Sequence, residues 1–198
     1  ADLMLIMGEE LAVKLNELDG VRAVMTRDAD IFIPLSARLT FARQVGADLF
    51  ISLHADALEE DEAQGASVYT LSTGGGAAAA QRIVERHERG DLLAGVDLDT
   101  AEDRVATALM QLARAETGPA ARRFADALVA SMRAQGVRLN NRPRREGQFA
   151  VLTAADFPSI LIEAGFLSNA QDRAILATAE GRARISRAIR DTVALLAR

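Results

Sequence analysis

The sequence predicts an α/β fold, in which a mostly parallel central sheet carries helices on both faces and a helical insertion. Helical and strand patterns alternate along residues 3–53, and another apolar strand followed by helices closes the chain. Alternation at this rhythm is typical of α/β units, because the helix between two strands returns the chain to the edge where the next parallel strand starts. A chain of 198 residues can bury one core of its own, so residues 1–198 are expected to form a single domain.

Each element is expected from a local pattern. Apolar residues at helical spacing predict helices, glycines mark their ends, and apolar runs rich in branched or aromatic residues predict strands. The first half is expected to hold a helix at 3–18 ended by Gly20, a strand at 21–26, a helix at 35–45 ended by Gly46, and strands at 49–53 and 67–71. The last third is expected to hold a polar, basic loop at 140–147, a short strand at 149–152, an apolar strand starting at 159, a helix starting at 168–169, and a closing helix with Ile185, Ile189, Val193 and Leu196 on one face.

Residues 74–136 carry no good strand pattern and are expected to form the helical insertion. An apolar stripe predicts one helix over residues 100–115, and Pro119, directly after Gly118, suits the first turn of a second helix. Insertions of this length are usually functional, as lids or binding elements. We expect this one on the edge of the sheet that carries the active site.

The composition excludes several classes of protein. The net charge of −5 argues against nucleic acid as a partner, because binding phosphates needs a broad basic surface. No apolar run approaches the roughly 18 residues of a membrane helix, so no transmembrane segment is expected. The absence of cysteine excludes disulfides, thiolate metal sites and cysteine nucleophiles. The chain opens at Ala1 within a helical pattern, which we interpret as a mature or trimmed fragment.

Two residues stand out as candidates for chemistry. His54 follows the apolar strand at 49–53, and Glu163 ends the apolar run at 160–162. Sites in open α/β sheets gather beyond the carboxyl ends of strands, so these side chains are expected to share one cleft. A neutral imidazole is a good zinc ligand, and a carboxylate beside the water can take its proton and return it to a leaving amine. Burial at an apolar strand end is expected to raise the pKa of Glu163.

Each of these residues also has a purely structural interpretation. A histidine at the end of a strand is often hydrogen-bonded without binding metal, and a buried glutamate can be paired instead of catalytic. Asp56 is expected to be a partner of the site or a loop cap and not a metal ligand. The charged residues at 26–30 and Arg38 are expected to fix a loop by ion pairing.

Three motifs in order resemble one family. MTRDADIFIPLSARLTFA, ADLFISLHADA and FPSILIEAGFLSNAQD are similar to the zinc-dependent N-acetylmuramoyl-L-alanine amidases of the third amidase group, and the match spans nearly the whole chain. The resemblance implies hydrolysis of peptidoglycan, at the amide bond between the lactyl group of N-acetylmuramic acid and the L-alanine of the stem peptide. It also implies export to the periplasm.

The resemblance assigns roles to both candidate residues. His54 corresponds to a Zn2+ ligand of the motif SLHAD, and Glu163 corresponds to the catalytic glutamate of LIEAGFLSN. In the family a first strand with a DPGHGG-type motif supplies another histidine ligand, and a glutamate follows it. We therefore expect the further zinc ligands upstream of residue 1.

The insertion resembles that of the amidases that separate daughter cells, in which a helical insert blocks the zinc until an activator with a LytM-type domain displaces it. The stretch ERHERGDLLAGVDLD resembles the autoinhibitory segment, and His87, Glu88 and Glu85 are the candidates to reach the metal. A solvated helix face is the alternative for all three. The stripe on the helix at 100–115 is expected either to bind the activator or to pack in the core.

Two other functional classes remain open from the sequence. The chain could be a non-catalytic amidase-like module that binds cell wall or a partner without hydrolysis. It could also be a metal-free α/β binding domain, in which His54 and Glu163 are structural. Close approach of these two side chains would argue against the second class.

Overall fold

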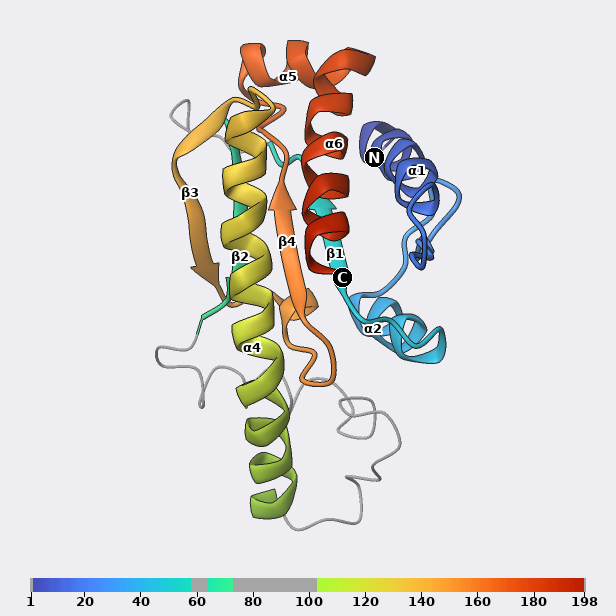
Figure 1. The fold of residues 1–198 in the computed structure, drawn as a ribbon, viewed down its shortest axis with the longest axis vertical. Coiled ribbons are helices and arrows are strands. Elements are labelled where there is room, and N and C mark those ends of the chain that lie inside the picture. Colours follow the sequence, from blue (N-terminus) through green and yellow to red (C-terminus); the bar gives the residue numbers. More distant parts are fainter. Residues whose placement is uncertain (1, 58–63, 73–102, 198) are drawn as a thin grey trace.

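The computed structural model describes residues 2–57, 64–72 and 103–197 (Figure 1). Its elements, in chain order, are α1 (Asp2–Asn16), α2 (Leu35–Gln44), β1 (Phe50–His54), β2 (Ala66–Leu71), α4 (Asp103–Ala134), β3 (Leu139–Gly147), the 3-10 turn η2 (Ala150–Leu152), β4 (Ser159–Glu163), α5 (Ala170–Ala177) and α6 (Ala179–Leu196). The α/β class is therefore confirmed.

The described strands form one mixed sheet in the order β1-β4-β2-β3. β1 and β4 run parallel, β2 and β3 run parallel, and β2 is antiparallel to β4. The carboxyl ends of β1 and β4 therefore lie at the same end of the sheet as the start of β2, as Figure 1 shows. This end carries both candidate site residues.

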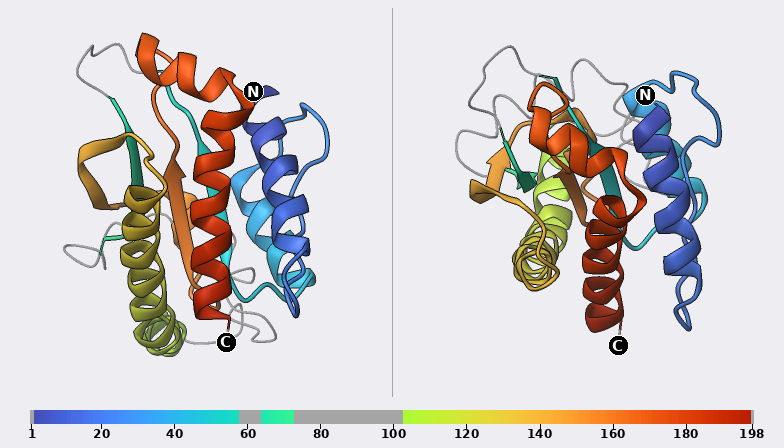
Figure 2. Two further views of the ribbon diagram at one scale, coloured as in Figure 1. Left: turned by 45° about the horizontal axis from the view of Figure 1, so that its top comes forward. Right: turned by 90° about the horizontal axis from the view of Figure 1, so that it is seen from above.

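Helices cover both faces of the sheet, as predicted. The larger core joins α1, α4 and α6 to one face through residues that are nearly inaccessible to solvent, including Met7, Leu128, Ile162 and Ile189. α4 and α6 lie side by side on this face (Figures 1 and 2). A second core packs α2 and η2 on the other face, around Leu39 and Leu161.

Three local predictions were wrong. The expected loop at 140–147 belongs to β3, and two of its arginines have partners at the edge of the sheet: Arg144 pairs with Asp126 at 2.9 Å, and Arg145 lies over the ring of Tyr69. Such charged strands protect a sheet edge from further pairing. The expected strand at 149–152 is the turn η2. Residues 21–26 form no strand and pair with none of the described strands.

The two helices expected on either side of Gly118 are one continuous helix, α4. Pro119 lies inside it, although proline lacks the N–H that a helix interior uses. The hydroxyl of Thr117 donates to the carbonyl oxygens of Ala113 and Ala155, which ties this turn to the loop before β4. Packing on the sheet outweighs the local break, since Phe124 and the residues after it are buried in the core.

The structure adds detail to the expected insertion at 74–136. Its last part, the second half of α4, is a core helix of the domain. β2 ends at the end of the sheet opposite Glu163, as the pairing of Ser67 with Glu163 requires. The expectation that the insertion lies on the active-site edge stays a prediction. Residues 73–102 lie outside the described residues.

Asp172, on α5, joins the loops around the site. Its buried carboxylate accepts hydrogen bonds from the amides of Gly65, before β2, and Phe166, after β4, at 2.7 and 3.0 Å. Arg138, before β3, pairs with its other oxygen. Three connections thus converge on one carboxylate that is 3% exposed.

We expect Asp172→Ala to lower the free energy of unfolding by about 3 kcal/mol, because it leaves two buried N–H groups without an acceptor and removes the carboxylate that pairs with Arg138. Urea denaturation would measure this. Asp126→Ala is the matched control: Asp126 also pairs with an arginine, but its side chain is 67% exposed, so a loss below about 1 kcal/mol is expected. Equal losses in the two variants would contradict this role of Asp172.

Candidate active site

The pairing of β1 with β4 brings the two candidate residues together. In this parallel register Phe50 lies opposite Ser159, and His54 lies opposite Glu163. Residues that face each other in neighbouring strands project from the same side of a sheet. The sequence prediction that these two side chains share one site, although 109 positions separate them, agrees with this geometry.

His54 is held between two polar groups. Its Nε2 lies 2.9 Å from Oγ of Ser52, which precedes it by two residues on the same side of β1. Its Nδ1 lies 3.7 Å from Oδ1 of Asp56. Burial lowers the pKa of His54, and the neighbouring carboxylate of Asp56 opposes this only in part. The imidazole is therefore neutral near pH 7, which is the form that binds metals.

Glu163 is 4% exposed, at the end of a strand whose five residues are all buried. The amide of Asp56 donates a 2.8 Å hydrogen bond to its Oε1. Burial raises the pKa of Glu163 to about 8; the Asp56 amide lowers it, and the Asp56 charge raises it. A carboxyl with a pKa near neutrality can both accept and donate a proton at physiological pH.

Backbone hydrogen bonds join the loops that follow β1 and β4. The amide of Ala164 donates to the carbonyl of His54 at 2.8 Å, and the amide of Leu167 donates to the carbonyl of Asp56 at 2.7 Å. Asn169 then caps α5 by accepting from two of its first amides. Asp56 is therefore a partner of the site through its backbone and its charge, as we expected.

The predicted ion pairs of the loop at 26–30 hold in part. Arg27 pairs with Asp30 at 3.0 Å. Arg38 instead donates to the carbonyl of Ile33 at 3.0 Å, and its charge contributes to lowering the pKa of His54. Arg38 is thus electrostatically coupled to the site.

Sequence reasoning missed Ser52 and Ser67. Ser52 could have been found from the alternation of the strand, because a residue two positions before His54 shares its side of the sheet. Ser67 lies opposite Glu163 in the antiparallel pair of β2 and β4. Only the register of the sheet shows this neighbour.

Within residues 2–57, 64–72 and 103–197, no three histidine or acidic side chains gather as a metal site would require. Among the described residues, His54 provides the imidazole that could bind a metal at the candidate site. His87, Glu88 and Glu85 fall outside the described residues.

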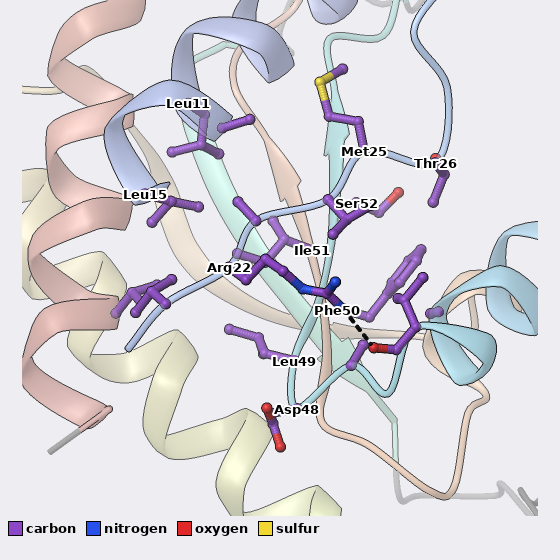
Figure 3. Close-up of a pocket in the computed structure, with 18 of the residues that line it drawn as sticks. Leu11, Leu15, Arg22, Met25, Thr26, Asp48, Leu49, Phe50, Ile51 and Ser52 are labelled. Atoms are coloured by element: carbon purple, nitrogen blue, oxygen red, sulfur yellow. Dashed lines mark hydrogen bonds between the residues drawn. The ribbon is translucent and has the colours of Figure 1, made fainter. Parts of the chain in front are cut away.

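A groove of about 780 Å³ runs beside β1 (Figure 3). Five consecutive residues, 49–53, line it, so it faces the edge of the strand and not one side of the sheet. The opposite wall is formed by α1 and residues 20–27. Among the described strands β1 pairs with β4 alone, so its second backbone edge faces this groove.

Comparisons with known proteins agree with the fold. A sequence model of the N-acetylmuramoyl-L-alanine amidases matches residues 1–194. N-acetylmuramoyl-L-alanine amidase AmiA of Escherichia coli K12 is 33% identical over 175 residues, which cover 88% of this chain and 60% of that protein. N-acetylmuramoyl-L-alanine amidase AmiC of Neisseria meningitidis serogroup B is 34% identical over 180 residues, which cover 88% of this chain and 42% of that protein.

Solved structures share the same architecture. The N-acetylmuramoyl-L-alanine amidase from Clostridium difficile 630 superposes with a TM-score of 0.68 over 97% of this chain and 80% of that one, at 21% identity. N-acetylmuramoyl-L-alanine amidase AmiC2 of Nostoc punctiforme superposes with a TM-score of 0.63 over 100% of this chain and 84% of that one, at 26% identity.

A neutral imidazole beside a buried carboxyl of raised pKa, at the carboxyl edge of two parallel strands, is a site suited to hydrolysis. Since the family model covers residues 1–194, the chain belongs to the N-acetylmuramoyl-L-alanine amidase family. It spans 60% of the E. coli relative and 42% of the Neisseria relative. Of the helices that the structure describes, none is both long and apolar enough to cross a membrane.

The raised pKa of Glu163 predicts how stability depends on pH in the metal-free protein. The folded state holds its proton up to about pH 8, whereas the unfolded chain releases it near 4.5. Stability should therefore fall as pH rises between these values, by a few kcal/mol at about 1.4 kcal/mol per pKa unit. Glu163→Gln should not show this loss.

Urea denaturation of both proteins from pH 5 to pH 9 would measure the difference. Glu180→Gln is the control, because Glu180 is a surface carboxylate paired with Arg184 and Arg187. The Glu180→Gln variant should not become more stable than the wild type as the pH rises. If wild type and Glu163→Gln lost stability in parallel, burial would not perturb Glu163 as described.

Proposed function

We propose that this protein is a zinc-dependent peptidoglycan amidase, which hydrolyses the bond between N-acetylmuramic acid and the L-alanine of the stem peptide. We further propose that it acts in the periplasm during daughter-cell separation. The observation that carries the proposal is the buried carboxyl of Glu163, paired in register with His54. Family membership supports the choice of substrate.

His54 would hold the zinc through a ring nitrogen. In the tautomer whose Nε2–H donates to Ser52, Nδ1 keeps its lone pair for the metal, and hydrogen bonds of this kind orient metal-binding histidines. Zinc bound there would polarise the scissile carbonyl and lower the pKa of the attacking water. A catalytic zinc takes about three protein ligands, so the described residues fit part of such a site.

The remaining ligands belong, in this proposal, to a segment upstream of residue 1. The groove beside β1 supports this. It presents an unpaired strand edge, and neighbouring strands lie about 4.8 Å apart, so an added strand beside β1 would end close to His54. The same strand would give residues 21–26 a pairing partner, which the described strands do not provide.

Glu163 would perform the proton transfers. Its carboxylate takes a proton from the attacking water and then delivers it to the amine of the departing L-alanine. The Asp56 amide holds one carboxylate oxygen in place during both transfers. A pKa near 8 fits a group that must do both at neutral pH.

We also propose that residues 74–136 regulate the site, with His87, Glu88 or Glu85 reaching the metal in the resting state. A LytM-type activator would release it. Leu112, on α4, supports an interaction surface, because its side chain is 70% exposed. Since the second half of α4 belongs to the core, the deletion that tests this proposal is confined to residues 74–102.

The roles of the two site residues can be separated in the full-length protein. Glu163→Gln should keep one zinc per chain and lose about 10²–10⁴-fold in kcat, because it removes the proton acceptor. His54→Ala should lose both zinc and activity. Metal analysis and hydrolysis of purified peptidoglycan measure these outcomes, with Asp126→Asn as a surface control.

A chelator should abolish wild-type activity, and zinc should restore it. If wild type bound no zinc and released no stem peptide, the alternative would hold: an amidase-like module that binds cell wall or a partner without hydrolysis. Sedimentation with peptidoglycan would then distinguish the binding module from a protein that does not recognise the wall.

Replacing residues 74–102 with a short glycine–serine linker should raise activity by about tenfold or more, as expected when the open state of an inhibited enzyme is a minor one. Replacing residues 58–63 in the same way is the control for exchanging a segment of the chain for a linker. Activity that is unchanged or lower, with zinc content and thermal stability preserved, would contradict autoinhibition by this segment.

A further inference from the structure

Ser67 is a buried hydroxyl without a partner. Its side chain is 0% exposed, and its Oγ makes no hydrogen bond within the part of the chain that the structure describes. It lies on β2 between Ala66 and Val68, which are also completely buried. An unsatisfied hydroxyl in such surroundings destabilises a fold, and alanine would fill the position without that penalty. The hydroxyl therefore calls for an explanation.

The neighbour of Ser67 provides one. Ser67 lies directly opposite Glu163 in the antiparallel pair of β2 and β4. Directly opposed residues project from the same side, with their Cβ atoms about 4.5–5.5 Å apart. From this distance a rotation about one side-chain bond can bring a serine hydroxyl to a neighbouring carboxylate.

Glu163 has room for a second donor. Oε1 accepts from the amide of Asp56, and this is the one hydrogen bond that the described residues give to the carboxylate. A donor on β2 would reach the carboxylate from the strand opposite β1. The two donors would then hold the group from both sides.

We propose that Ser67 is a positioning residue, whose hydroxyl donates to Oε2 of Glu163 and fixes the carboxylate for proton transfer. The proposal rests on the amidase function proposed above. Ser67 acts only through Glu163: it touches neither the substrate nor the metal. Its removal therefore affects the chemical step and leaves the binding of substrate and zinc intact.

Ser67→Ala in the full-length protein is the test. We expect kcat to fall about tenfold, which corresponds to one misplaced hydrogen bond in the transition state. KM and zinc content should not change, and the urea midpoint should stay equal or rise, since a buried unsatisfied group is removed. Ser67→Thr keeps the hydroxyl and should recover most of the activity.

Thr70→Val is the matched control. Thr70 lies on the same strand and is 2% exposed, and its hydroxyl also makes no hydrogen bond to the residues that the structure describes. It is three positions from Ser67 and therefore projects from the other side of the sheet, away from Glu163. Its replacement should leave kcat unchanged.

Unchanged kcat in Ser67→Ala would overturn the proposal. A fall in kcat matched by losses of stability or zinc would also overturn it, because it would indicate a structural role. If the wild type had no amidase activity, the proposed function would be contradicted, but the proposed contact between Ser67 and Glu163 would not. The position of the hydroxyl still decides in that case: a crystal structure should place Oγ within about 3.2 Å of Oε2, and an Oγ directed elsewhere contradicts the proposal.

Discussion

The in-register pairing of β1 with β4 is the constraint on which the site depends. It sets His54 opposite Glu163 and continues into the loops, where the carbonyls of His54 and Asp56 accept hydrogen bonds from the loop after β4. A shift of one residue would move one of the two side chains to the opposite side of the sheet. Both strands are held by cores on the two faces, since Ile162 packs with α4 and α6 while Leu161 packs with α2.

Burial gives the two residues their chemical character. The same removal from water that lowers the pKa of His54 raises that of Glu163, so a neutral base and a carboxyl near neutrality sit side by side. Such a pair suits a metal ligand and a proton carrier. Burying the two groups costs free energy, and the packing of the surrounding sheet offsets it. The Asp56 amide partly offsets that cost by bonding the carboxylate.

Strand ends and helix caps could be predicted from the sequence because they depend on local patterns. His54 and Glu163 follow apolar runs, and Asn169 begins α5 at the expected place. Elements that depend on distant partners could not be predicted. β3 reads as a loop until the partners of its arginines are known, and α4 passes through Pro119 because the sheet supports it. The position of Ser67 opposite Glu163 can be recognised only when the register of the sheet is known.

The proposed reaction requires that His54 and Glu163 form one zinc-dependent centre. A crystal structure of the full-length protein grown with zinc, with anomalous data at the zinc absorption edge, would test this most directly. We predict one peak about 2.1 Å from a ring nitrogen of His54, with the Glu163 carboxylate beside the metal and not among its protein ligands. A zinc bound away from His54, or no zinc peak at full activity, would contradict it.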